Sequence, residues 1–453
     1  MHHAYLTVDL GFGDAGKGSI VDFLTRDTGA HTVIRFSGGA QAAHRVVTAT
    51  QEHIFAQFGS GTLAGAGTHL SRFMLLDPLA MCAEEAHLRA VGVSDAWART
   101  TIDERAPIIT PFHRAVNRLR ELARADGRHG SCGVGIGETM VDYLQYGSAT
   151  LFAGDLLHPD KLRAKLRLLH TINWAKVQEL GAGLCNSVEA GPELAVFQAV
   201  DEVDWLVEQY CDFARAAQIV PGGHLHTILR RLGVVIFEAA QGVLLDEWHG
   251  FHPHTTWSTT TLENADTLLA EAHYSGEVTR IGITRAYMTR HGAGPLMTED
   301  AALTAALPDA RNSFGAWQRG FRVGWLDLVL LRYACAVVGP LDYLAVTCLD
   351  RLAVCDPLYV CRSYQHESAL IQQIARSPVP HALDYQAQLT WFLTGCTPIL
   401  DRVTNTNSLL NALTAALGLR IGLVSAGPTA REKRWLTNTE SSYSATISLV
   451  VSG

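Results

Sequence analysis

The sequence predicts an α/β protein with a large, mostly parallel central sheet and flanking helices. Short apolar runs alternate with amphipathic helical patterns along the chain. At least five predicted strands end in polar or glycine-rich loops, as strands do at the ligand-binding edge of an open parallel sheet. The first strand, Tyr5 to Leu10, leads through glycines into a helical pattern, which is the layout of a P-loop-related phosphate site.

The loop after this strand, Gly11 to Gly18, contains the pattern G-x-x-x-x-G-K. Its glycines allow backbone N–H groups to approach phosphate, and Lys17 supplies a point charge. Gly18 stands where P-loops usually place a Mg²⁺-binding Ser or Thr. Asp14 lies inside the loop, where a carboxylate is useful for holding a metal or moving a proton. Because the chain has only five lysines among 36 basic residues, a lysine here favours nucleotide binding over an ordinary strand–helix turn.

Other predicted strands also lead into loops of small or polar residues. The second strand, 31–36, ends in small residues and His44, and the glycine-rich loop 130–137 follows a helix predicted over 108–125. That loop is compatible with anion binding and with a hinge. Strand 233–237 ends in Glu238 and Gln241, and further strands are predicted at 280–283, 341–347 and 421–424.

A hydroxyl-rich segment at 246–260 contains His249, His252 and His254. Three histidines could indicate a metal, but no Cys or carboxylate accompanies them at ligand spacing. We therefore interpret the segment as a loop over a phosphate.

The composition restricts the class of protein. With 48% hydrophobic and 18% charged residues, the chain is typical of a well-buried globular protein. A net charge of −8 argues against a broad nucleic-acid surface. Nine scattered cysteines without C-x-x-C favour neither a disulfide framework nor zinc. We find no signal peptide, membrane span, repeat or long linker, and expect a cytoplasmic protein with a single domain over residues 1–453.

These motifs, in this order, resemble the adenylosuccinate synthetase family. The resemblance runs from Val8 to about Arg434 and leaves 435–453 as a divergent C-terminal tail. It rests on 11–18, 37–44, 76–78, 133–137, 237–246, 249–260, 285–299, 324–327, 349–350 and 425–428. It implies a homodimeric ligase that uses GTP and Mg²⁺ to phosphorylate the 6-oxygen of IMP, after which the amine of aspartate displaces the phosphate.

The resemblance also implies the role of individual residues. Asp14 is the base for the purine N1 proton, His44 donates to the γ-phosphate, and Lys17 and Gln241 complete the catalytic set. The nucleoside triphosphate is bound by Gly13, Asp14, Ala15, Gly16, Lys17, Gly18, Ala43, His44, Arg45, Cys348, Asp350, Ser425 and Gly427, and Mg²⁺ by Asp14 and the carbonyl of Ala43. The purine nucleotide is bound by Gln41, Ser131, Cys132, Gln241, Thr256 and Arg319, and the amino acid by Trp317, Arg319, Phe321 and Arg322.

Several positions depart from the family pattern. The family's Lys beside the guanine carboxylate is Cys348 here, a Thr on the purine-nucleotide phosphate is Cys132, and the Arg crossing the dimer aligns near Tyr146. One arginine of the aspartate clamp is replaced by Phe321 or displaced to Arg322. The donor can therefore be GTP or ATP. The acceptor can be IMP, dGMP as in a phage 2-aminoadenylosuccinate synthetase, or an analogue used by a biosynthetic-cluster paralogue. A non-catalytic nucleotide-binding regulatory relative is the alternative from another class.

Overall fold

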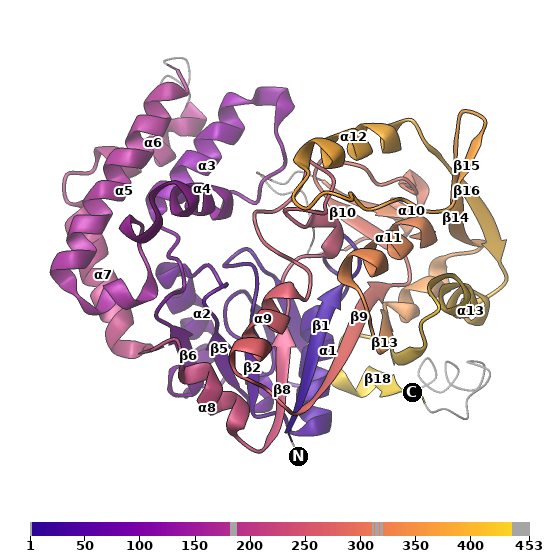
Figure 1. The fold of residues 1–453 in the computed structure, drawn as a ribbon, viewed down its shortest axis with the longest axis horizontal. Helices are drawn as coiled ribbons and strands as arrows, with labels where there is room; N and C mark the ends of the chain where they lie inside the picture. The colour runs from indigo at the N-terminus through magenta and orange to yellow at the C-terminus, as the bar shows by residue number, and fades with distance from the viewer. Residues whose placement is uncertain (1, 182–187, 310–311, 313–316, 318–319, 437–453) are drawn as a thin grey trace.

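A ten-stranded sheet forms the centre of the molecule (Figure 1). The computed structural model describes residues 2–181, 188–309, 312, 317 and 320–436. The strands follow the order β18 (Lys433–Trp435), β17 (Ile421–Ser425), β13 (Tyr343–Thr347), β9 (Glu277–Arg285), β1 (His2–Asp9), β8 (Gly233–Glu238), β2 (Thr32–Arg35), β5 (Gly67–Leu70), β6 (Thr100–Asp103) and β7 (Gln218–Val220). Neighbouring strands are parallel except β17 and β18. The predicted α/β fold with a mostly parallel sheet is confirmed.

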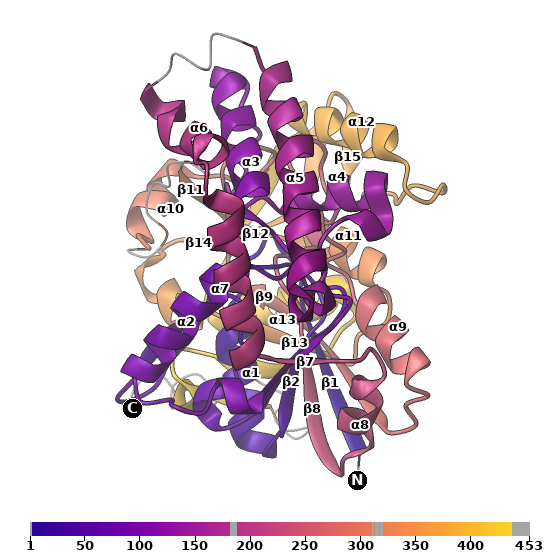
Figure 2. The ribbon, with the colours of Figure 1, turned by 90° about the vertical axis from the view of Figure 1, so that its left-hand side faces the viewer.

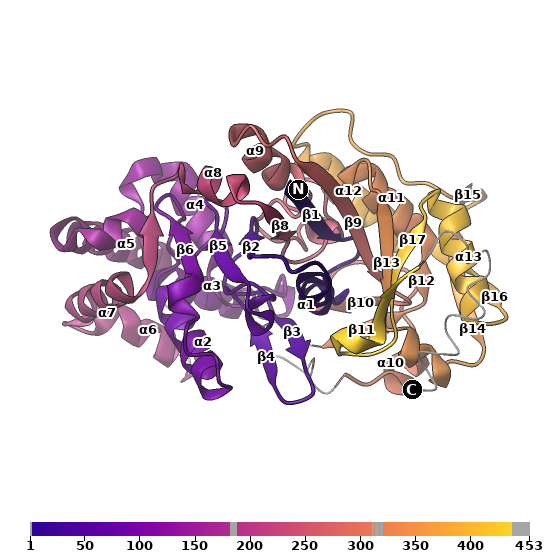
Figure 3. The same ribbon diagram turned by 90° about the horizontal axis from the view of Figure 1, so that it is seen from below.

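Helices cover both faces of this sheet, as the view from below shows (Figure 3). Ile20, Val21 and Leu24 of α1 (Lys17–Thr28) pack on one face with Val33 and Ile236. On the other face, α8 (His224–Arg230), α9 (Glu263–Glu271), α11 (Leu328–Val338) and α13 (Thr406–Leu417) share a core with β1 and β8. Because successive strand side chains alternate between the faces, β8 contributes Val235 and Phe237 to one core and Val234 and Ile236 to the other.

A helical lobe stands beyond β5 and β6 and faces the viewer in Figure 2. It contains α2 (Pro78–Ala90), α3 (Pro111–Ala123), α4 (Ile136–Tyr146), α5 (Pro159–Glu179), α6 (Gly191–Gln198) and α7 (Glu202–Ala216). Side chains from α2, α3, α5, α6 and α7 form a second core with β5 and β6. Among the described residues, none of the helices has the length and apolar content needed to span a lipid bilayer.

Smaller elements bring the loops of the site together. β3 (His44–Val47) pairs with β4 (Glu52–Phe55), and β10 (Met288–His291) pairs with β11 (Phe321–Gly324). A third sheet, near α10 (Ala301–Ala306) and α12 (Leu383–Thr394), contains β12 (Leu326–Asp327), β14 (Leu358–His366), β15 (Ala369–Ile371) and β16 (Thr397–Val403). Since the main strands are parallel, their carboxyl ends lie at one edge of the sheet. The last residues of β1, β8, β9, β13 and β17 are Asp9, Glu238, Arg285, Thr347 and Ser425. The candidate site lies at this edge.

Candidate active site

The loop between β1 and α1 has the backbone of a phosphate-binding loop. Gly13, Asp14 and Gly16 have φ values of 94°, 60° and 85°, and Gly16 caps α1. No side chain in the described part of the chain caps this helix. Its first N–H groups, which have no acceptor within the helix, therefore remain for an anion. The loop also contacts the end of β8, because Leu244 N–H donates to the Gly11 carbonyl (3.1 Å).

Lys17 is 3% exposed, and its ammonium group pairs with the carboxylate of Asp9 at 2.8 Å. Asp9 is completely buried and also accepts hydrogen bonds from the N–H groups of Gly11 (2.8 Å) and Ala15 (3.0 Å). Asp9 lies within the strand predicted over Tyr5 to Leu10, and no role was predicted for it. A carboxylate near the end of this apolar strand, next to the loop, was the available signal for its role.

Asp14 faces a histidine that the sequence analysis missed. Its carboxylate lies 3.0 Å from Nε2 of His291, at the end of β10. Burial favours a higher pKa for Asp14, but the hydrogen bond and charge of His291, together with Arg285 and Lys17, lower the pKa to about 2. The same contact raises the pKa of His291 against the effect of its own burial. Asp14 is therefore ionised at neutral pH, as a metal ligand or general base must be.

His44 lies directly over the start of α1. A Cβ added to Gly18 would lie 2.7 Å from the Cβ of His44, so only glycine allows β3 to approach the helix this closely. This packing is the physical reason for glycine at the position of the missing hydroxyl residue.

The imidazole of His44 is fixed by Glu238 at the end of β8. Nδ1 lies 2.6 Å from the Glu238 carboxylate, which also accepts hydrogen bonds from the N–H and hydroxyl groups of Ser60. Burial favours a higher pKa for Glu238, yet Arg35, His44 and Ser60 bring it to about 2. Burial lowers the pKa of His44, and the charge of Glu238 opposes that effect. An ionised Glu238 requires the proton on Nδ1, so Nε2 is the nitrogen that remains for a ligand.

Two glutamines meet around the Gly38–Gly39 turn. A Cβ on Gly38 would lie 3.0 Å from Oε1 of Gln241, and a Cβ on Gly39 would lie 3.1 Å from Oε1 of Gln41. Gln41 has no hydrogen-bond partner for either side-chain polar atom among the described residues, and Gln241 has none for Oε1. Amide groups of this kind can donate and accept hydrogen bonds at the polar edge of a purine base. Thr256 lies on a neighbouring loop, where its N–H group donates to the carbonyl of Leu245 (2.8 Å).

The loops after β13 and β17 form the predicted nucleobase end. Cys348 has φ 60°, Asp350 follows it, and burial raises the pKa of the Asp350 carboxyl group. On the next strand, Ser425 Oγ donates to the Gly427 carbonyl (3.1 Å). Lys433, which was not predicted, is 5% exposed and donates to the carbonyls of Gly427, Pro428 and Thr429 at 2.9–3.3 Å.

The second glycine-rich loop is held against the helical lobe. Ser131 Oγ donates to Asn117 (2.9 Å), and Cys132 follows with its thiol pKa raised by burial. Trp317 covers the loop, since a Cβ on Gly133 would lie 2.9 Å from its ring. Arg118 stacks on that ring with its guanidinium carbon 5.5 Å from the centroid.

The predicted amino-acid residues separate in the structure. Phe321 packs on His291 with ring centroids 4.9 Å apart, which places it next to the partner of Asp14. Arg322 pairs with Glu299 (2.6 Å) and donates to the carbonyls of Gly292 and Gly294. Arg319 lies outside the described residues. Arg322 is therefore already engaged by protein groups, whereas Phe321 presents an apolar ring.

Some predicted residues have only local contacts. Arg45 is exposed and pairs with Glu52 (3.0 Å), and Ala43 is an exposed residue immediately before β3. His252 contacts the Glu247 carbonyl at 2.7 Å, and the His254 carbonyl accepts from Arg290. Within the described ranges, no group of three or more His, Cys, Asp or Glu side chains could hold a metal ion. Any Mg²⁺ would need backbone or phosphate oxygens in addition to Asp14.

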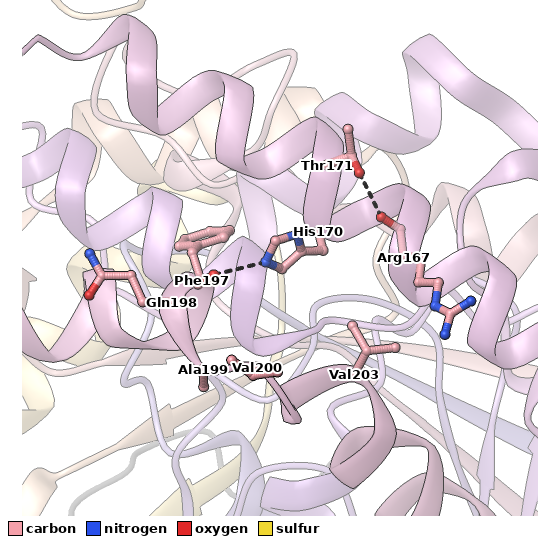
Figure 4. A pocket seen from close by; sticks show the side chains of 8 residues that line it. All are labelled: Arg167, His170, Thr171, Phe197, Gln198, Ala199, Val200 and Val203. Carbon is pink, nitrogen blue, oxygen red and sulfur yellow. Dashed lines mark hydrogen bonds between the residues drawn. The ribbon is translucent and has the colours of Figure 1, made fainter.

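Two cavities differ in their relation to this loop. One of about 10 Å³, close to the size of a single water, lies beneath it and is lined partly by Asp9, Gly13 and Arg285. The other, about 460 Å³, is open and lies among α5, α6 and the start of α7, where His170 Nε2 donates to the Phe197 carbonyl at 3.1 Å (Figure 4). The second cavity is lined by residues of the helical lobe, and none of its lining residues belongs to the phosphate-binding loop.

Comparisons with known proteins identify the family. The family model for adenylosuccinate synthetase matches residues 7–434. An adenylosuccinate synthetase of Desulfovibrio desulfuricans is 32% identical over 446 residues, covering 93% of this chain and 97% of the relative. The chain belongs to the adenylosuccinate synthetase family. The family's adenylosuccinate synthetase from Salinibacter ruber is 34% identical over 382 residues, covering 81% of this chain and 82% of the relative.

Solved structures of this family support the same fold. A fully ligated adenylosuccinate synthetase from Plasmodium falciparum matches with a TM-score of 0.77 at 18% identity, covering 96% of this chain and 99% of that one. A succinoaminodeoxyadenylate synthetase from cyanophage S-2L, bound to dGMP and dATP, matches with a TM-score of 0.61 at 14% identity, covering 100% and 99%. The chain is accordingly a ligase of the adenylosuccinate synthetase type.

Proposed function

We propose that this ligase phosphorylates the 6-oxygen of a purine nucleotide, IMP or a close variant, and joins the amine of aspartate or a related amino acid to C6. The observation that carries the proposal is the ionised carboxylate of Asp14 inside a phosphate-binding loop. Lys17 is part of the same loop, His44 packs on its helix, and Gln241 adjoins it. A site of this kind can deprotonate a purine lactam beside a bound triphosphate.

The chemistry follows from the charges of these side chains. With a pKa of about 2, Asp14 is a weak base, so N1 must lose its proton as O6 attacks the γ-phosphorus. Lys17 and the first N–H groups of α1 would hold the phosphate oxygens. His44, oriented by Glu238, would donate from Nε2 once the phosphate charge favours its protonated form.

We further propose Mg²⁺ and GTP as the cofactor and phosphate donor. The Asp14 carboxylate and the Ala43 carbonyl are hard oxygen ligands that suit Mg²⁺, and the ion would supply charge neutralisation on the phosphates. Asp350 would accept from N1 and N2 of guanine, and adenine presents no such pair of donors there. We place the enzyme in the cytoplasm, acting on small molecules.

We also propose a homodimer. Tyr143, Leu144 and Tyr146 of α4 are exposed, Leu144 by 65%. A run of large apolar side chains on one helix is suited to an interface between subunits. Light scattering on the purified protein should give about twice the chain mass of 49.2 kDa, and Leu144→Glu should shift it to the monomer.

The deciding experiment incubates the protein with Mg²⁺, GTP or ATP, a purine nucleotide and an amino acid. IMP, dGMP and purine analogues are compared as acceptors, and aspartate is compared with other amino acids. We expect phosphate release that requires all components and a product with the added amino acid by mass spectrometry. Asp14→Asn should abolish both.

Other outcomes would select other functions. Activity with dGMP and not with IMP would make the chain a 2-aminoadenylosuccinate synthetase-type enzyme. Phosphate release that needs the nucleotides but no amino acid would contradict the ligase. Tight nucleotide binding without turnover, unaffected by Asp14→Asn, would indicate a regulatory relative.

A further inference from the structure

Asp9 is the buried anion of the phosphate-binding loop. Its carboxylate oxygens accept hydrogen bonds from Gly11 N–H (2.8 Å), Ala15 N–H (3.0 Å) and Lys17 Nζ (2.8 Å). Asp9 itself is fully buried, and Lys17 is 3% exposed. The two backbone donors and one ammonium group resemble the donor set that such a loop offers to phosphate.

The loop is also fixed on its other side by its carbonyl groups. Thr347 Oγ1 donates to the Ala15 carbonyl (2.8 Å), and Arg285 Nε donates to the Asp14 carbonyl. The peptide groups around Ala15 are thus held from both directions. The loop is preformed by groups of the protein, and its shape does not depend on a bound nucleotide.

Lys17 has two possible anionic partners. In this structure its ammonium group is paired with Asp9, and a triphosphate at the start of α1 would be the second partner. If Lys17 moved to the phosphate, Asp9 would keep its two backbone N–H donors, so its charge would not be left without hydrogen bonds. The exchange of partners is therefore physically feasible.

We propose that Asp9 is a positioning residue that competes with the nucleotide phosphates for Lys17 and so weakens triphosphate binding. The inference rests on the proposed function, because it assumes that this loop binds a nucleoside triphosphate. The Asp9 carboxylate lies 2.8 Å from the Lys17 ammonium group, in a buried region where screening is weak, so the phosphates must displace it from Lys17. Asp9 thus holds Lys17 in place between turnovers. The same contact also lowers the affinity of the loop for nucleotides, which favours their release.

The test measures binding rather than turnover. Dissociation constants for tripolyphosphate, GTP and ATP are determined by calorimetry for the wild type and Asp9→Asn. The variant keeps a similar shape but removes the charge that holds Lys17. We expect the dissociation constants to fall by about tenfold or more. In the variant, Lys17 has no carboxylate partner, so a bound phosphate becomes the anion with which it pairs.

Asp155→Asn is the matched control. Asp155 is another buried carboxylate that binds a lysine, Lys165 (2.6 Å), and a backbone N–H group, that of Phe152 (2.9 Å), but it lies in the helical lobe. Its substitution should leave the dissociation constants within about twofold of the wild type. In a Lys17→Met background, Asp9→Asn should no longer tighten binding.

Unchanged or weaker binding by Asp9→Asn would overturn the inference, as would equal tightening in the Lys17→Met background. If Asp9→Asn does not fold, a structure of the wild type with GTP and Mg²⁺ decides. We expect Lys17 Nζ to leave Asp9 for a phosphate oxygen, and a retained contact between them would overturn the competition. A wild type that binds none of the three ligands would contradict the proposed function instead.

Discussion

Glu238 determines which nitrogen of His44 faces the nucleotide. It is completely buried, and its carboxylate contacts Nδ1 while the neighbouring Arg35 and Ser60 keep it ionised. The side chain of His44 therefore has a single orientation and tautomer before any ligand binds. With Nδ1–H directed at Glu238, Nε2 can donate to a developing phosphate charge once it is also protonated, and the Glu238 carboxylate stabilises the resulting imidazolium.

Glu238→Gln should lower kcat by about 10–100-fold with a smaller effect on KM for the nucleotides. Glutamine retains the size of the side chain but removes the charge that stabilises protonated His44. Steady-state kinetics check this expectation. Glu84→Gln is the control, because Glu84 is a buried carboxylate that accepts three backbone N–H bonds away from the loop. An unchanged kcat in Glu238→Gln would exclude a positioning role.

The predicted and missed residues differ in a physical way. The loop motif 11–18 and the loops carrying His44 and Gln241 could be recognised because each is a local pattern that adjoins a strand end. The partners of these residues could not, because His44 and Glu238 are 194 positions apart and meet only through the sheet. The same holds for Asp14, in the loop after β1, and His291, at the end of β10. The predicted assignments of substrate contacts remain predictions.

The second residue of helix α1, Gly18, is glycine for a reason of packing. Alanine normally favours a helix interior by about 1 kcal/mol over glycine. At position 18 its Cβ would lie 2.7 Å from the Cβ of His44 and 2.9 Å from the His44 carbonyl carbon, so β3 would have to move. The close approach of β3 to α1 therefore requires glycine at position 18.

Gly18→Ala should therefore reduce kcat by at least about tenfold, because the added methyl group would displace His44. The variant should remain folded. Gly223→Ala is the matched control, since a Cβ there meets nothing within 4 Å. Kinetics and thermal unfolding of both variants are compared. Equal activity of the two variants would show that the contact between β3 and α1 tolerates a methyl group.

The start of α11 carries a buried carboxyl group. Asp327 accepts from the N–H groups of Val329 and Leu330 and from Tyr364 Oη at 2.7 Å. Burial raises its pKa to about 6 despite these hydrogen bonds. In the unfolded chain the same group titrates near 3.9.

Between about pH 4 and 6, the unfolded state therefore loses this proton before the folded state does, and stability falls as the pH rises. The wild type should lose up to about 3 kcal/mol relative to Asp327→Asn between pH 4 and 7. Urea unfolding of both proteins across this range measures the difference. A difference that does not change with pH would mean that Asp327 titrates normally in the folded protein.

At the level of elements, the sequence indicated helices α1 and α3 and the inner strands β1, β2, β8, β9, β13 and β17. Their apolar periodicity and glycine breaks are local. Strand pairings could not be predicted in this way: β10 and β11 pair with each other although about thirty residues of chain separate them. Non-local pairing depends on partners that short patterns do not specify.

The whole molecule combines several cores on one sheet. The inner strands have one core on each face, another core fills the helical lobe, and the parallel pair β2–β5 joins the two parts. Within the described ranges, the lobe has no sheet of its own. We therefore expect the single domain predicted over 1–453 to unfold in one calorimetric transition, shifted upward by GTP. Two separate transitions would instead make the helical lobe an independent folding unit.

The low lysine content has a practical consequence for chemical biology. Lys17 and Lys433 are buried, Lys165 and Lys176 are 13% and 14% exposed, and Lys161 alone is largely accessible at 57%. Acyl-phosphate derivatives of nucleotides, which acylate amines near a bound triphosphate, would meet little competition from surface amines on this protein. Labelling of Lys17 and its suppression by unmodified GTP or ATP could thus report occupancy of the nucleotide site in crude extracts.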